Sequence, residues 1–144
     1  MEMKKAVQLL AGHSITAYIS AILFGAPLFS MITETLIFSC LLSLLVSLPC
    51  LWFCGTSYLH ILDLFTSPKN HKNERSAKFI VLMTIFGSWI GSVVIPLDWE
   101  VWWQTWPISN CVVMILLSFF GWLLNLTLFK YYPALVPFAV KRKI

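Results

Sequence analysis

Two carboxylates, Asp98 and Glu100, lie in the part of this chain whose residue types come closest to a chemical site. Two neighbouring acids can act as a general acid and base, or can contribute ligands to a metal ion. No histidine and no third acid lies near them in the sequence, so the pair makes a weak catalytic or metal site. We therefore predict that both carboxylates fix a turn or contact a partner. The chain is expected to have no catalytic and no metal-binding residues.

The two acids share their segment, residues 95–109, with four of the seven tryptophans. A charged Asp at the bilayer centre costs roughly 2.5–3.5 kcal/mol on insertion scales, which argues against a membrane span here. Tryptophan has an apolar ring and a polar N–H group, and it gathers at the membrane–water interface. The segment is therefore predicted to form an interfacial loop, residues 98–107, between two apolar runs.

The composition is that of an integral membrane protein. The 144 residues are 59% hydrophobic and only 11% charged, whereas soluble domains have about 25% charged residues. The mean hydropathy is +0.83. The four cysteines lie in or beside apolar runs and are predicted to be small buried side chains.

Four apolar windows are long enough to cross about 30 Å of hydrocarbon as helices. They are continuously apolar, which favours helices over the alternating strands of a barrel. We predict an all-α, polytopic bundle that forms one membrane domain over residues 1–144. The first window is expected to be a retained span and not a cleaved signal peptide. The predicted spans are residues 6–24, 32–54, 79–97 and 108–129, with a linker at residues 55–78.

The ten Lys and Arg residues predict the orientation of these spans. They lie before the first span, in the linker and after the last span, whereas the loops at 25–31 and 98–107 contain none. Because cytoplasmic loops are enriched in Lys and Arg, both termini and the linker should face the cytoplasm and the tryptophan-rich loop the lumen. The net charge of +4 thus indicates membrane topology and contact with anionic membrane lipid, with no nucleic-acid partner.

Some residues within the spans have spacings or positions that indicate contacts. Gly87 and Gly91 are four residues apart, which is typical of close helix packing. His13 is expected to be a satisfied polar side chain in the first span. Glu34 lies near the start of the second span, where its carboxylate could reach the membrane surface or meet a cation of a partner.

Six short motifs follow one another along the chain. They are Gly25-Ala-Pro-Leu28, Glu34-Thr-Leu-Ile-Phe38, Leu48-Pro-Cys-Leu51, Gly87-Ser-Trp-Ile-Gly91, Ile95-Pro-Leu-Asp-Trp-Glu100 and Trp103-Gln-Thr-Trp-Pro-Ile-Ser109. The last two are the most specific, because chance matches of that length and tryptophan content are rare. Together these motifs resemble the PIG-F family of glycosylphosphatidylinositol (GPI) anchor biosynthesis. The resemblance covers residues 18–110.

The resemblance implies a non-catalytic, multi-pass subunit of the endoplasmic-reticulum membrane, with no cofactor. Members of the family bind and stabilise the large GPI ethanolamine-phosphate transferases, so the expected partner is a PIG-O-like or PIG-G-like enzyme. Family members usually carry a further pair of apolar segments at the N-terminus. This chain is therefore expected to be a short form, a fragment or a divergent member.

The family matches within the loop fall on Trp99, Trp103 and Trp106, which we expect to serve structure and partner contact. Trp102 lies outside the match and is expected to be a dispensable interfacial anchor. The other residues expected to serve structure or partner contact are Asp98, Glu100, Gln104, Pro107 and Glu34.

Two other functions compete with this interpretation. The first is a membrane enzyme or lipid carrier that acts directly on the GPI precursor, with Asp98 and Glu100 as working acids. The second is a small channel, which would need polar or charged residues repeated along one helix face. The channel is the weaker alternative, because the later spans offer only Ser, Thr and isolated Cys.

Overall fold

The computed structural model of this chain describes residues 2–23, 25–26, 29–55, 72–97 and 100–131. These ranges contain four α-helices and one short 3₁₀ turn, and they contain no strand, which confirms the predicted all-helical fold. The elements are α1 (Glu2–Leu23), α2 (Ile32–Cys54), α4 (Lys72–Ser92), η1 (Trp102–Gln104) and α5 (Ile108–Tyr131).

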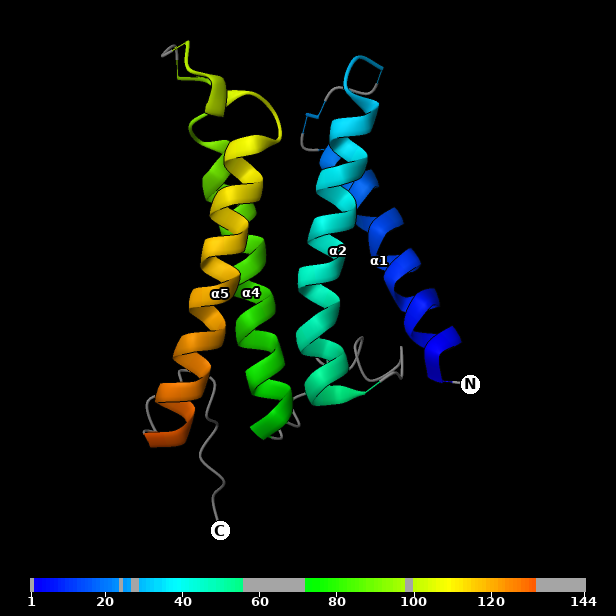
Figure 1. The fold of residues 1–144 in the computed structure, drawn as a ribbon, viewed down its shortest axis with the longest axis vertical. Coiled ribbons are helices and arrows are strands. Elements are labelled where there is room, and N and C mark those ends of the chain that lie inside the picture. The colour runs from blue at the N-terminus through cyan, green and yellow to red at the C-terminus, as the bar shows by residue number, and fades with distance from the viewer. Residues whose placement is uncertain (1, 24, 27–28, 56–71, 98–99, 132–144) are drawn as a thin grey trace.

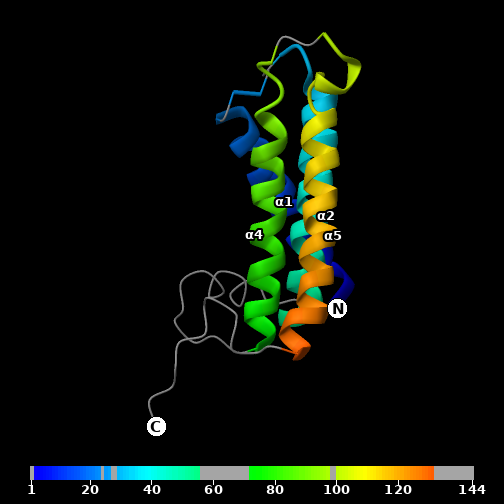
Figure 2. The same ribbon diagram turned by 90° about the vertical axis from the view of Figure 1, so that its left-hand side faces the viewer.

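The four helices run side by side and alternate in direction (Figure 1; Figure 2). α4 packs most extensively against α5, and α2 packs against both α1 and α4. The connections α1–α2 and α4–α5 lie at one end of the bundle (Figure 1). The start of α1, the end of α2, the start of α4 and the end of α5 lie at the opposite end. The bundle therefore has one end formed by these two connections and an opposite end formed by the other helix termini.

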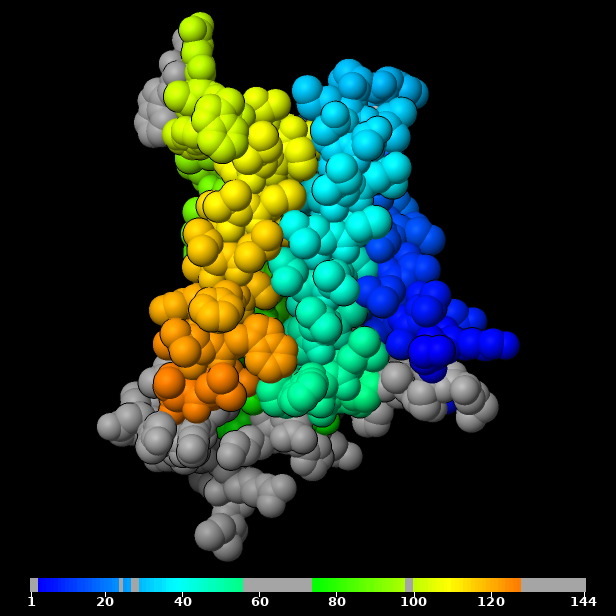
Figure 3. Space-filling model, viewed as in Figure 1, coloured from blue at the N-terminus to red at the C-terminus, as the bar shows by residue number. Residues whose placement is uncertain are grey.

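Many small side chains lie in the interior of the bundle, and many large apolar side chains lie on its exterior. Ala17, Ala21 and Ala77 are buried, whereas Trp52 is 78% and Phe119 is 70% exposed. Figure 3 shows the face of the molecule that α5, α2 and α1 form together. An apolar exterior around closely packed small residues is expected where lipid surrounds the helices, because association in lipid depends on close packing.

Three of the helices are long and apolar enough to cross a membrane: Met3–Leu23, Ile32–Cys54 and Ile108–Thr127. The bounds predicted for the second span are those of α2. α1 begins earlier than predicted, at Glu2, and α5 ends slightly later, at Tyr131. Proline does not end α2, since Pro49 is buried inside the helix and the helix continues to Cys54.

The helix in the region of the third predicted span has different bounds from that span. α4 already begins at Lys72, so residues 72–78 belong to a helix and not to the predicted linker, and it ends at Ser92. Its first two turns carry charged residues, which leaves an apolar helical part shorter than the ~20 residues that a span needs. Beyond Ser92 the chain forms tight turns, in which Leu97 N–H donates to the Val94 carbonyl at 3.2 Å. The remainder of the predicted linker, residues 56–71, lies outside the described residues.

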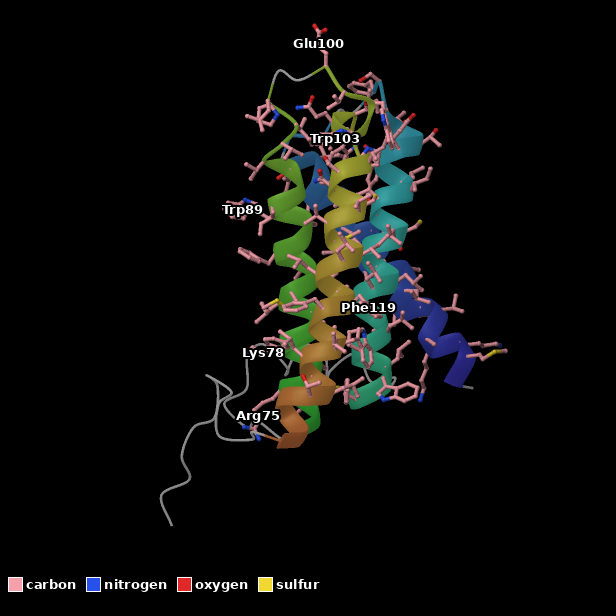
Figure 4. All side chains as sticks on the ribbon, turned by 60° about the vertical axis from the view of Figure 1, so that its left-hand side comes forward. Arg75, Lys78, Trp89, Glu100, Trp103 and Phe119 are labelled. Carbon is pink, nitrogen blue, oxygen red and sulfur yellow. The ribbon has the colours of Figure 1, made fainter. Side chains whose placement is uncertain are left out.

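Charge separates the two ends of the bundle. Lys4 and Lys5 lie near the start of α1, and Arg75 and Lys78 lie in the first turns of α4. Figure 4 shows Arg75 and Lys78 at one end and Glu100 at the other. Within the described ranges, every Lys and Arg lies at the end that holds the start of α1.

Candidate functional site

Gln104 fastens the tryptophan-rich loop to the chain that leaves α4. Its side chain is buried, with 8% exposure. Its Nε2 group donates to the backbone carbonyl of Val94 at 2.8 Å and to that of Leu97. Its Oε1 accepts the Val101 N–H at 3.4 Å. A buried amide that satisfies backbone groups on both sides of a loop fixes the shape of that loop.

Trp106 fastens the same loop to α2. Its indole N–H donates to the hydroxyl of Thr35 at 3.2 Å, although the two residues are 71 positions apart in the sequence. Its ring packs on Phe38 with the ring centroids 5.0 Å apart and tilted by 49°. Phe38 belongs to a buried cluster with Ala21 and Met114, so this contact joins the loop to α1, α2 and α5.

Two residues close to Trp106 in the sequence, Trp103 and Pro107, are also partly or fully buried. Pro107 is buried and follows a cis peptide bond. Trp103 is half-buried at the same end of the bundle (Figure 4). The predicted residues Gln104, Trp106 and Pro107 therefore lie together at the base of the loop.

Glu100 and Trp102 point away from this base. Glu100 is exposed and has a left-handed backbone conformation, with φ of 49°, which is uncommon for a residue other than glycine. Figure 4 shows its carboxylate directed away from the helices. Trp102 is 76% exposed. The two side chains border an open hollow of about 540 Å³. It is lined by Leu97, Glu100, Val101, Trp102, Gln104 and Thr105.

Two other predicted residues, Asp98 and Trp99, lie outside the described residues. Glu34 is half-buried in the first turn of α2, at the same end of the bundle as the loop. Within the described ranges, no group of three His, Cys, Asp or Glu side chains could hold a metal ion.

Gly87 and Gly91 allow α4 and α5 to approach each other closely. A Cβ atom at Gly87 would lie 2.9 Å from the Met114 Cα, and one at Gly91 would lie 2.6 Å from the Asn110 Cα. Both distances are too short for a real Cβ contact. Asn110 adds a hydrogen bond across the same interface, since its Nδ2 donates to the Ser88 carbonyl at 3.1 Å.

The sequence analysis missed a buried polar line along α2. It consists of Thr35, Ser39, Ser43 and Ser47, all at most 1% exposed. The Ser43 hydroxyl donates to the Leu10 carbonyl at 2.8 Å, and Ser47 shares a 2.7 Å hydrogen bond with His13. The second contact confirms the prediction for His13. The spacing of four residues is the sequence signal for this line, because it puts small side chains on one helix face.

The hydroxyls of this line form hydrogen bonds inside the bundle. Ser39 donates to the Thr35 carbonyl at 2.7 Å, and Thr35 donates to the Met31 carbonyl at 2.9 Å while accepting the indole N–H of Trp106. The line therefore joins α1 to α2 at one end and the loop to α2 at the other. Because these hydroxyls form hydrogen bonds between packed elements of the bundle, they give no support to the channel alternative.

The fold and the site together define a helical membrane protein whose end loop is tied down by buried polar groups. The chain belongs to the GPI biosynthesis protein family Pig-F, whose model matches residues 2–126. The family predicted from the motifs is thus confirmed, over a longer part of the chain than the motifs cover.

Curated relatives carry names that describe an accessory role. The chain is 37% identical over 95 residues to a GPI ethanolamine phosphate transferase, stabilizing subunit, of Mus musculus, covering 64% of this chain and 42% of the relative. The protein of the same name from Homo sapiens is 37% identical over 91 residues, which cover 61% of this chain and 41% of the relative.

A fungal relative matches a longer part of this chain. The glycosylphosphatidylinositol anchor biosynthesis protein 11 of Debaryomyces hansenii is 34% identical over 111 residues, covering 75% of this chain and 47% of the relative. The chain thus spans less than half the length of these relatives. No solved structure matches it.

Proposed function

We propose that this chain is a non-catalytic membrane subunit that binds and stabilises a GPI ethanolamine-phosphate transferase during assembly of the GPI-anchor precursor. The names of the mammalian relatives carry this proposal, since both describe a stabilizing subunit of such an enzyme. We propose a PIG-O-like or PIG-G-like transferase as the partner, in the endoplasmic-reticulum membrane. Residues 1–144 would act as a single membrane domain.

The use of the loop residues supports a structural role. The polar groups of Gln104 and Trp106 form hydrogen bonds within the chain itself. Gln104 donates to the Val94 and Leu97 carbonyls, and Trp106 donates to the Thr35 hydroxyl. A reacting group needs free polar atoms directed at a substrate. The tied loop would instead present a fixed surface to a partner, with Glu34 at the same end of the bundle. Asp98 and Trp99 are proposed to extend that surface.

The charge distribution supports an orientation with cytoplasmic termini. The described Lys and Arg residues lie at one end of the bundle, and cytoplasmic segments of membrane proteins are enriched in these residues. The tryptophan-rich loop would then face the lumen.

Purification of the tagged chain from cells in mild detergent tests the proposal. A stoichiometric ethanolamine-phosphate transferase in the eluate is the expected result. Transfer of ethanolamine phosphate by the chain after the transferase has been removed would overturn the non-catalytic role. It would favour the alternative of a membrane enzyme or lipid carrier that acts on the GPI precursor.

A further inference from the structure

The tryptophan-rich loop has an inner side and an outer side with different chemistry. On the inner side, Gln104 and Trp106 are engaged by backbone carbonyls and by the Thr35 hydroxyl. On the outer side, Glu100 and Trp102 are exposed and border the open hollow. We call Glu100 and Trp102 the outer rim. Trp106 is half-buried, and its ring already packs on Phe38 within this chain.

The outer rim lies at the end of the bundle where the described part of the chain has no basic residue. The sequence has no Lys or Arg between residues 25 and 31 or between 93 and 107. Within the described part of the chain, the cations Lys4, Lys5, Arg75 and Lys78 lie at the opposite end. Among the described residues, no Lys or Arg lies at the end of the bundle that holds the Glu100 carboxylate.

An exposed indole and an exposed carboxylate that line the same hollow suit the arginine side chain. Arginine stacks its guanidinium on an aromatic ring and donates several N–H groups to a carboxylate. The hollow of about 540 Å³ beside the rim leaves room for such a side chain. A lipid surface would match the rim less well. Tryptophan suits the headgroup region, but a lumenal headgroup surface without net positive charge gives the exposed Glu100 carboxylate no counter-charge.

We propose that the outer rim is the docking point for a basic, arginine-bearing segment of the partner transferase at the membrane surface. This inference rests on the proposed function and adds to it the surface and the chemistry of the contact. It gives Trp102 a contact role, whereas the family match alone makes Trp102 a dispensable anchor. It also limits Trp106 to holding the loop in shape.

Site-specific photocrosslinking in the intact complex tests the proposal. Benzoylphenylalanine replaces Trp102 in one variant and Trp89 in a control, since Trp89 is 63% exposed on α4, away from the loop. The expected result is a transferase adduct from position 102 that maps to a peptide containing arginine. Position 89 should give no adduct in that peptide. Adducts with lipid alone at position 102, while the transferase still co-purifies, would overturn the docking point and leave the proposed function intact.

A charge series at Glu100 tests the electrostatic part separately. Glu100→Lys should lower transferase recovery by about tenfold, because like charges across an interface are strongly unfavourable. Glu100→Gln should give a smaller loss of transferase recovery. Raising the salt concentration should reduce the difference in recovery between Glu100→Gln and the wild type, because salt screens the attraction of the carboxylate for a cation. Ser30→Lys is the matched control, because Ser30 is exposed at the same end of the bundle but does not line the hollow. It should leave transferase recovery unchanged. Equal recovery of the transferase with Glu100→Lys and with the wild type would contradict the proposal. Absence of the transferase from the wild-type preparation would instead contradict the proposed function.

Discussion

The indole N–H of Trp106 donates to the hydroxyl of Thr35 at 3.2 Å and so fastens the loop after α4 to the first turn of α2. Thr35 begins the line of small polar residues that runs down α2 to Ser47, where the line contacts His13 of α1. One helix face thus connects the end loop to α1. Loss of the Trp106–Thr35 contact should loosen the loop without removing any helix.

A double-mutant cycle measures this contact. Trp106→Phe keeps an aromatic ring against Phe38 but removes the N–H donor, and Thr35→Val removes the acceptor. Interhelical hydrogen bonds in membrane proteins contribute about 0.6 kcal/mol on average, so we expect a coupling energy of that order in reversible unfolding in detergent. The cycle corrects for the bond from Thr35 to Met31, which Thr35→Val also removes. Strictly additive losses would show that the two side chains are not coupled.

The glycine contact between α4 and α5 predicts an unusual sensitivity to alanine. Gly91→Ala would put a methyl group 2.6 Å from the Asn110 Cα, a backbone atom that cannot yield unless the helices separate. We expect a loss of about 1–3 kcal/mol, as for overpacked cores, and a similar loss for Gly87→Ala. Unfolding followed by circular dichroism in detergent measures both.

Gly12→Ala is the matched control for these two variants. Gly12 lies in α1 and has nothing within 4 Å of an added Cβ, and alanine favours a helix more than glycine does. Its stability should equal or slightly exceed that of the wild type. If Gly91→Ala and Gly87→Ala behaved like Gly12→Ala, the close approach of α4 and α5 would be wrong.

Gln104 predicts a difference between two substitutions of similar size. Gln104→Glu keeps the shape of the side chain but replaces the donor that serves the Val94 and Leu97 carbonyls with a carboxylate oxygen. Gln104→Leu leaves the same carbonyls without a donor, at a cost of about 1–3 kcal/mol. Gln104→Glu should be at least as damaging, because it directs negative charge at both carbonyls. Amide hydrogen exchange at residues 93–97 should accelerate in both variants. It should stay unchanged in Thr105→Val, a control at an exposed position.

The distribution of Lys and Arg predicts the topology. A glycosylation acceptor inserted with a spacer beside Thr105 should be modified in microsomes, because the tryptophan-rich loop faces the lumen. The same acceptor appended after Ile144 should stay unmodified. Modification at the C-terminus and not beside Thr105 would reverse the orientation.

Local patterns in the sequence predict the helices better than the contacts between them. α2 was located correctly because a long apolar run ends at Gly55. The start of α4 differs from the predicted start because the charged residues before Phe79 suggest a linker, although charged residues form helices readily. The hydrogen bonds of Gln104 and Thr35 are not predictable from the sequence, since the local pattern does not identify the groups of this chain to which each residue bonds. Trp106 was singled out by the family match, but its bond to a residue 71 positions away required the structure.

Partner abundance and turnover, measured together, test the account most directly. Cells that lack this chain are supplied with the wild type, with Trp106→Ala, with Asp98→Ala plus Glu100→Ala, or with Trp89→Ala as a control on the outer face of α4. The account predicts that Trp106→Ala and the double variant lower the steady-state amount of the ethanolamine-phosphate transferase. Turnover per surviving complex should stay near normal in both. Trp89→Ala should change neither the amount of transferase nor its turnover. Unchanged transferase abundance with a collapse of turnover per complex in the double variant would contradict it, because the loop would then take part in the chemistry.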